Sequence, residues 1–344
     1  FSAVTRVVGN VTNTVTLLSL LTILEAHAAM ASTVLSGSLL LVCSLSNKGH
    51  GRPRSRQARS RQPGLHATGA LTRDEDLEAY LASGQFVASD RKAQNYCEAA
   101  MRFNETLTLA AGHPDPRHRS SPTTSQFGQD VLMWRNYFSA LTVRNEIGYY
   151  VDSGANDATW GSNTWFYDHC LGWKGLCVDA QPKYWRRLRS HRSCKLIKMC
   201  IGAEHKNMTW SGRGATGGLN LGPSKRAGTM RVECSPLPSM LQMAAASGQQ
   251  LIGGRDSMPA EVTFWSLDVE GAELLVLNAT LASWLVHVRV IMVEFGHHVD
   301  TMEPFMAARG FVKVRQPSRI SIDHVYINNR DVDELMPAVL WDPP

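Results

Sequence analysis

The sequence predicts an α/β domain built on a doubly wound, mostly parallel sheet. After Ser125, short apolar runs alternate with amphipathic stretches, and this strand–helix rhythm is typical of sheets covered by helices on both faces. The 344 residues are 44% hydrophobic and 19% charged. This balance excludes a wholly disordered chain, a collagen and a coiled coil.

The apolar runs define the expected elements. Strands are predicted over 148–152, 175–179, 194–201, 262–269 and 288–294, with closing strands at 311–314 and 320–327 that are expected to pair. Helices are predicted over 162–171, 183–192, 272–278 and 304–309. Ligands of such sheets bind beyond the carboxyl ends of the strands, near the point where the strand order reverses.

Composition divides the chain into four parts. We assign 1–70 to a leader and basic linker, 71–124 to a helical or irregular extension, 125–330 to the domain, and 331–344 to a tail. The net charge is 35 − 30 = +5. Residues 1–70 contain seven basic residues and one acid, so the remainder carries 28 − 29 = −1. The charge therefore gives no reason to expect nucleic-acid binding by the domain.

The leader allows three interpretations. The apolar run Val15–Leu24 resembles the core of a secretory signal, and Ala28–Leu45 is a weakly hydrophobic candidate for a membrane anchor. The stretch that begins at Met30 is rich in Ser and Arg and free of acids, as transit peptides are. A leader with neither role stays open. We expect a lumenal or membrane-associated protein slightly more than an imported one, and the sequence indicates no oligomeric state.

The first predicted strand ends in a turn suited to a nucleotide-type ligand. Asp152 closes the strand, Gly154 allows close backbone approach, and Asn156 and Asp157 follow. Asp179 ends the second strand, where an acid accepts hydrogen bonds from ribose hydroxyls in nucleotide-binding folds. The later glycines of the pyrophosphate-binding motif are missing, which disfavours NAD.

A second group of acids follows the fourth predicted strand. Asp268 ends that strand, and Glu270 and Glu273 open the next helix, where acids either cap the helix or serve a ligand. Such carboxylates suit a sulfonium, a substrate hydroxyl or a divalent ion. Glu294 ends the next strand, and the nearby His297 is a candidate base.

These segments resemble FkbM-type methyltransferases. The matching blocks are SQFGQD (125–130), GYYVDSGAND (148–157), GWKGLCVD (172–179) and LDVEGAE (267–273). The resemblance implies a class I fold that binds S-adenosylmethionine (SAM) and methylates a hydroxyl of a glycan or small metabolite. We expect Asp268, Glu270 or His297 to orient or deprotonate this hydroxyl, and we assign no metal ligand.

The chain departs from the family at two positions. Ala158 stands where the family usually has Gly, and Asp179 stands where Glu often ends the second strand. These departures leave a second hypothesis open, in which the domain is a catalytically degenerate binding or scaffold module. The stretch 210–259 shows least resemblance, and we expect substrate choice to depend on it.

The cysteines and glycosylation sequons bear on the compartment. A Cys170–Cys194 disulfide is expected if the chain is secretory, whereas Cys177 and Cys200 are expected to be buried thiols. The cysteine spacing does not fit a zinc site. Sequons for N-glycosylation begin at Asn10, Asn104, Asn207 and Asn278.

Overall fold

The structure, a computed structural model, describes most of the chain after residue 73. The described ranges are 74–83, 91–103, 123–212, 217–219, 230–248, 260–283, 286–294, 299–314 and 323–336. They all belong to one compact unit, Pro63–Pro344. The leader, with its two apolar runs, lies outside them. Within these ranges, every helix is too short or too polar to cross a membrane.

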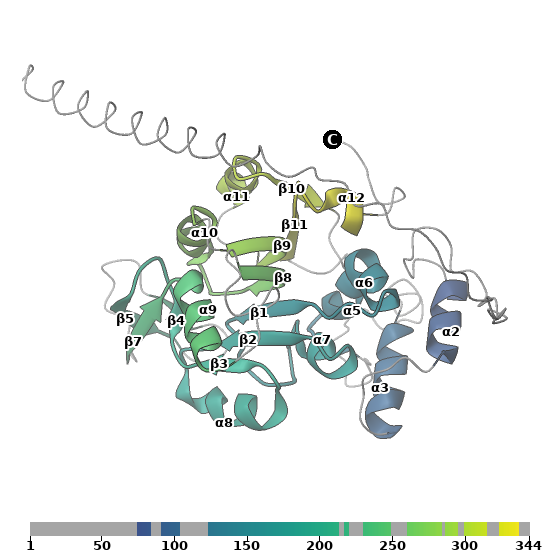
Figure 1. Cartoon of the computed structure of the whole chain (residues 1–344). Helices are drawn as coiled ribbons and strands as arrows, with labels where there is room; N and C mark the ends of the chain where they lie inside the picture. The colour runs from purple at the N-terminus through teal and green to yellow at the C-terminus, as the bar shows by residue number, and fades with distance from the viewer. Residues whose placement is uncertain are drawn as a thin grey trace, which may run out of the picture. The chain divides into compact units, whose positions relative to one another are not determined.

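A seven-stranded sheet forms the centre of the fold, in the order β10-β11-β9-β8-β1-β2-β3 (Figure 1). Its strands are β1 (Tyr149–Ser153), β2 (Lys174–Val178), β3 (Lys195–Ile197), β8 (Ala260–Leu267), β9 (Val286–Glu294), β10 (Phe311–Val314) and β11 (Asp323–Asn328). Strand β11 runs opposite to the other six strands of this sheet, so its pairs with β10 and β9 are antiparallel. The chain runs from β1 outward through β2 and β3 and then continues at β8, on the other side of β1. The strand order therefore switches between β1 and β8.

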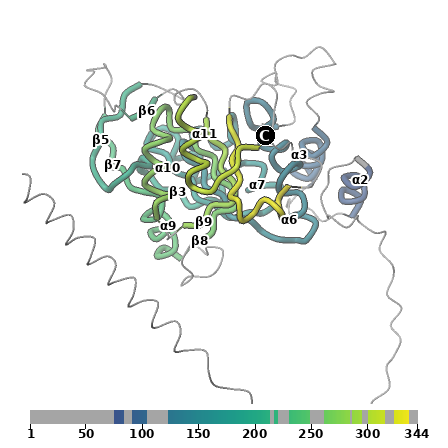
Figure 2. Tube along the Cα trace, turned by 90° about the horizontal axis from the view of Figure 1, so that it is seen from above, coloured from purple at the N-terminus to yellow at the C-terminus, as the bar shows by residue number. Residues whose placement is uncertain are grey.

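Helices cover both faces of this sheet (Figures 1 and 2). Tyr150 packs into the core on one face, whereas Tyr149 and Val151 pack into the core on the other, as alternation along a buried strand requires. The first core contains side chains from α2 (Asp74–Ala82), α3 (Arg91–Met101), α5 (Gln129–Met133), the π-helix η1 (Trp134–Phe138), α6 (Ser139–Val143), α7 (Trp165–Cys170), α8 (Pro182–His191) and α12 (Val332–Leu335). The second contains side chains from α9 (Leu237–Ala246), α10 (Glu273–Leu281) and α11 (Val299–Ala307). The doubly wound architecture is confirmed.

Several element boundaries differ from the sequence prediction for local reasons. The helix expected from residue 162 begins only at Trp165, because the Ser162 hydroxyl oxygen accepts the N–H groups of Thr164 and Trp165 and so occupies the turn before the helix. The helix expected over 304–309 starts earlier, at Val299, and contains Pro304.

A second, smaller sheet was not predicted. It contains β4 (Cys200–Ile201), β5 (Lys206–Ser211), β6 (Gly218–Leu219) and β7 (Met230–Ser235), in the order β4-β7-β5-β6. The strand predicted over 194–201 is therefore wrong as a single element: its first part is β3 in the main sheet, and its last part is β4, which pairs with β7. Figure 1 shows the small sheet beyond the carboxyl ends of β1 and β2.

Three disulfides correct the cysteine predictions. Cys170 bonds Cys97 of α3, at a Cα separation of 5.5 Å, and not Cys194. Cys177 bonds Cys194, and Cys200 bonds Cys234, so neither Cys177 nor Cys200 is a free thiol. The expected pairing failed because it considered the parallel strands alone, whereas α3 brings a further cysteine against α7. Helix α3 of the N-terminal extension is thereby bonded to the domain.

We predict that these three pairings appear in peptide maps of the unreduced protein. Of the seven cysteines, only Cys43 should then react with a thiol reagent. The double variant C97S/C170S should lose about 4 kcal/mol of unfolding free energy, because the broken bond closes a long loop; denaturant titration measures the loss. The variant C43S is the control. Free Cys97 and Cys170 thiols in protein secreted from cells would contradict the assignment.

Candidate functional site

A cavity of about 410 Å³ opens where the strand order switches. This volume lies in the range of small-molecule sites, roughly 300–1,000 Å³. Six of the residues that the sequence singled out line it: Asp152, Gly154, Asn156, Asp157, Asp268 and Glu270. They converge because β1 and β8 are parallel neighbours, so that the turns after them lie at the same edge of the sheet.

The turn after β1 is fixed to the strands on either side. The N–H groups of Gly154 and Ala155 donate to the Val178 carbonyl of β2, and the Asp268 N–H donates to the Ser153 carbonyl. Gly154 has a φ of +80°, and a Cβ at this position would overlap the Asp268 carbonyl oxygen. The conformation therefore requires glycine. Ala158, which stands where the resembled family usually has Gly, is fully buried and packs in the core.

Asp179 holds two backbone segments together. One carboxylate oxygen accepts the Asn156 N–H at 2.7 Å, and the other accepts the Gln181 N–H at 2.6 Å. Burial raises the pKa of Asp179 to about 6, although these two N–H groups favour its ionised form. Each oxygen retains a second lone pair, so the carboxylate can still accept a ligand hydroxyl.

Asp179 lies beside a second, smaller cavity. This space measures only about 30 Å³ and shares Gly154, Asn156, Asp268 and Glu270 with the larger cavity. Trp210 of β5 also lines it. The hairpin β5–β6 approaches closely, because a Cβ at Gly218 would lie 2.8 Å from the Glu270 carbonyl oxygen. A ligand larger than one or two waters can reach Asp179 here only if this wall shifts.

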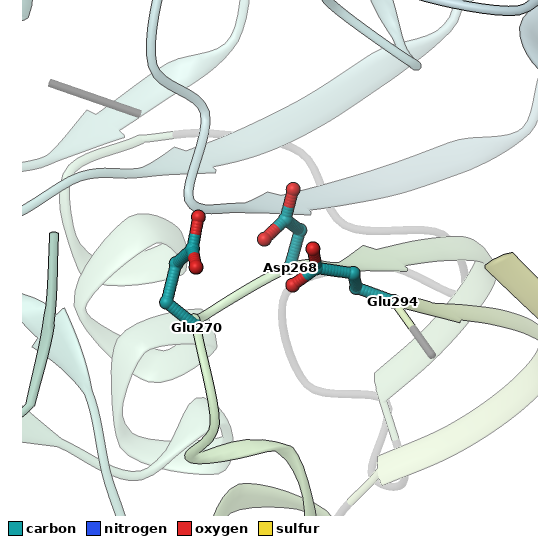
Figure 3. Close-up of side chains that lie close together, drawn as sticks. All are labelled: Asp268, Glu270 and Glu294. Atoms are coloured by element: carbon teal, nitrogen blue, oxygen red, sulfur yellow. The ribbon is translucent and has the colours of Figure 1, made fainter. Parts of the chain in front are cut away.

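Three carboxylates that line the larger cavity lie close together (Figure 3). Asp268, Glu270 and Glu294 each offer an oxygen within 4.8 Å of the others. Burial, together with the charges of Glu294, Asp323 and Glu270, raises the pKa of Asp268 well above its ordinary value. Asp268 therefore holds its proton to a higher pH than an ordinary carboxyl does. Three such oxygens are also the ligand type that Mg²⁺ and Ca²⁺ prefer.

The two acids at the start of α10 have different roles. Glu273 is fully buried, and one of its oxygens accepts the N–H groups of Val269 and Gly271, so it holds the turn before the helix. Glu270 has a φ of +54°, rare for a residue with a side chain, and lines both cavities. Glu273 therefore fixes the turn before the helix, whereas Glu270 faces the cavities.

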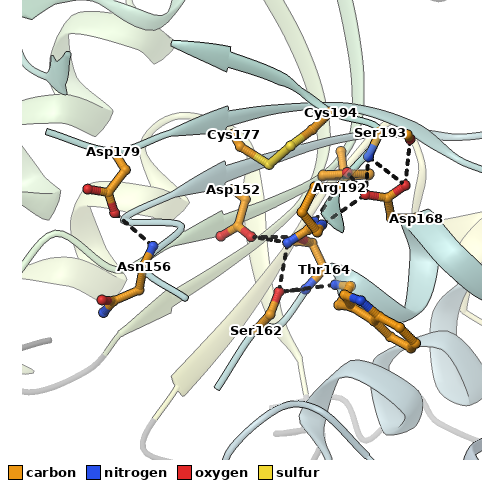
Figure 4. Close-up of a disulfide and its surroundings, with 12 residues drawn as sticks. Asp152, Asn156, Ser162, Thr164, Asp168, Cys177, Asp179, Arg192, Ser193 and Cys194 are labelled. Carbon is orange, nitrogen blue, oxygen red and sulfur yellow. Dashed lines mark hydrogen bonds and ion pairs between the residues drawn. A yellow bond between two sulfur atoms is a disulfide. The ribbon is translucent and has the colours of Figure 1, made fainter. Parts of the chain in front are cut away.

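A buried arginine links Asp152, which lines the larger cavity, to Asp168 of α7 (Figure 4). Arg192 donates to Asp168 at 2.8 Å and lies 3.5 Å from Asp152, and its side chain has no exposed surface. Thr164 donates to the same Asp152 oxygen at 2.5 Å. Burial alone would raise the pKa of Asp168, but Arg192 and Ser193 lower it overall. At Asp152, burial raises the pKa more than the charge of Arg192 lowers it, so the pKa is raised overall.

Some site residues were missed or lie beyond the described ranges. The candidate base His297 is outside the described residues. Asp323 and Gln129 line the cavity and bond each other at 3.0 Å. The sequence assigned a site role to neither of them, although Gln129 lies in the block 125–130. Asp323 begins β11. Because β11 runs opposite to the parallel strands, its start lies at the edge of the sheet where those strands end. Asp323 is therefore paired with Glu294, the last residue of β9.

Comparisons with known proteins assign this chain to no family. No family model matches the chain, and no curated protein matches it either.

We predict that removing the buried arginine is costly. Arg192→Met leaves Asp152 and Asp168 buried without their cation, which should lower the unfolding free energy by about 3–5 kcal/mol in urea titrations. Arg187→Met is the matched control: Arg187 pairs with Asp157, but its side chain is 49% exposed, so the loss should stay below about 1 kcal/mol. Equal urea midpoints for the two variants would contradict the assigned role of Arg192.

Proposed function

We propose that this domain is a SAM-dependent methyltransferase acting on a hydroxyl oxygen. The observation that carries the proposal is the hydrogen bond between the Asn156 N–H and Asp179. It joins a glycine turn after the first strand to the acid after the second, directly beside a cavity lined by carboxylates. The FkbM-type sequence blocks supply both halves of this arrangement, and the reversed strand β11 agrees with the closing strands of a class I fold.

The residues present fit the proposed cofactor. Asp179 would accept the ribose hydroxyls, and the turn Gly154–Asn156 would hold the amino-acid end. The carboxylates of the larger cavity favour a positively charged sulfonium over a neutral thioether. The wall at Trp210 must shift to admit the adenosine, since the space beside Asp179 is small.

When bound, the cofactor would supply an electrophilic methyl group, which would pass from sulfur to the substrate oxygen and leave the carbon–sulfur electron pair on sulfur. The proton of the hydroxyl must then leave. In our proposal, the cluster of Asp268, Glu270 and Glu294 orients the hydroxyl and takes this proton. His297 remains a second candidate base from the sequence.

The disulfides favour an oxidising compartment. Cytosolic proteins rarely keep structural disulfides, and three occur within the described part of this chain. The sequon residue Asn207 is exposed on β5, where a glycan is tolerated. We therefore propose that the domain works in a secretory lumen, where glycans are available acceptors. A soluble protein imported into an organelle is the competing model.

A degenerate, non-catalytic domain is the second candidate. The small volume beside Asp179 favours it, because cofactor binding requires a shift of the surrounding wall. Calorimetry with SAM separates the two hypotheses: a catalytic domain binds SAM and its demethylated product, whereas a scaffold binds neither.

We predict that SAM affinity depends on pH through Asp179. Its raised pKa of about 6 means that the carboxyl is protonated below pH 6 and loses acceptor capacity there. SAM should bind about tenfold more weakly at pH 5 than at pH 7.5, because one pKa unit corresponds to a factor of ten. Asp179→Asn should bind weakly, without this step. A wild-type affinity independent of pH would contradict the ribose role of Asp179.

We predict that the cluster acids affect turnover more than SAM binding. Glu294→Gln removes one carboxylate next to Asp268 and should lower kcat by roughly 10²–10⁴-fold, the usual range for a lost general base. Asp268→Asn resembles the protonated acid and should cost less. Labelled-SAM transfer to a mixture of oligosaccharides gives kcat, and calorimetry gives SAM affinity. Unchanged turnover in Glu294→Gln and Glu270→Gln would exclude the cluster as the base.

A further inference from the structure

An exposed tryptophan stands at the wall of the larger cavity. Trp160 is 66% exposed, more than any other large hydrophobic side chain among the described residues, and it lines the cavity that holds the carboxylate cluster. A tryptophan presents a large apolar face, and exposing one beside this cavity leaves the face available to a ligand.

The backbone beneath Trp160 is held in place. The N–H groups of Thr159 and Trp160 both donate to one oxygen of Asp157, at 3.0 Å each. The other oxygen of Asp157 pairs with Arg187, and the next residue, Gly161, donates to the Thr124 carbonyl at 2.8 Å. Asp157, a predicted cofactor residue, thus shapes the turn that presents Trp160.

Two buried oxygen atoms in the same cavity have no hydrogen-bond donor among the described residues. They are Asn163 Oδ1 and Glu294 Oε2. The amide nitrogen of Asn163 already donates to Ser266 at 3.1 Å, which fixes the amide with its oxygen as the spare acceptor. A buried acceptor without a donor is unfavourable. A ligand that carries several hydroxyl groups would satisfy both atoms.

The cavity also disfavours negative charge. Six carboxylates line it: Asp152, Asp157, Asp268, Glu270, Glu294 and Asp323. Arg192 and Arg187 neutralise charge only at Asp152 and Asp157. A phosphate, sulfate or hexuronate group entering the cavity would meet the remaining acids at close range.

From these observations we propose that the methyl acceptor is an uncharged sugar, whose pyranose ring packs on Trp160 while its hydroxyls bond Asn163 and Glu294. One face of a pyranose carries C–H groups that pack against the electron-rich face of an aromatic ring. The ring edge carries hydroxyls, which are the donors that the two oxygens need. An alkyl chain lacks these donors, and a nucleotide carries the charge that the cavity disfavours. The inference rests on the proposed methyl transfer and names its substrate class.

The test measures binding of the full chain to an array of neutral, hexuronate and sulfated oligosaccharides, with demethylated SAM present. Wild-type protein should bind neutral sugars only. Trp160→Ala should weaken this binding about tenfold. This factor is the one expected when a single aromatic contact and the apolar area that it buries are lost. Trp160→Phe should retain most of it. Ile147→Ala, which changes another exposed hydrophobic residue, is the control and should bind as wild type does.

Kinetics distinguish a docking role from a structural one. Trp160→Ala should raise KM for a neutral oligosaccharide and leave kcat and SAM affinity unchanged, because stacking on the sugar ring is the same in the ground state and the transition state. Preference for hexuronate or sulfated sugars, binding of no sugar, or equal binding by Trp160→Ala and wild type would overturn the proposal. If wild-type protein fails to bind SAM in calorimetry, the proposed function itself fails, whatever the array shows.

Discussion

The buried cation of Arg192 is the interaction on which the site depends. Its guanidinium joins Asp168 of α7, the helix that connects β1 to β2, to Asp152 near the end of β1. Arg192 also donates to Ser162 and Thr164, which precede α7. One side chain therefore fixes the strand end, the turn and the helix that surround the larger cavity. Without it, two carboxylates would be buried without compensation, which is far costlier than losing a surface ion pair.

The sequence predicted those site residues whose position follows from the direction of a strand. Asp152 and Asp268 both end apolar runs, and parallel pairing of β1 with β8 brings such ends together. It did not predict Asp323, because this residue starts a strand, and only knowledge that β11 is reversed places it beside Glu294. Topology, which depends on pairing between distant segments, decides such cases, and local hydrophobic pattern does not.

The small sheet and the disulfides escaped prediction for a related reason. The short strands β4 and β6 contain two residues each and leave no periodic signal. Cys177 lies inside an apolar strand and looks like an ordinary buried thiol, yet β3 pairs beside it and brings Cys194 to a Cα separation of 5.7 Å. Pairing of cysteines requires three-dimensional proximity, so spacing along the chain was a poor guide.

The acids of this site differ in what balances their charge. Asp152 and Asp157 each have an arginine and backbone or hydroxyl donors, so their charges serve to hold the turn after β1. Asp268 lies beside Glu294 instead, and burial together with the neighbouring acids raises the pKa of Asp268. A proton or a cation must compensate them, and an incoming hydroxyl or sulfonium meets this need. The same residue type therefore provides rigidity where it is paired with arginine and reactivity where it is not.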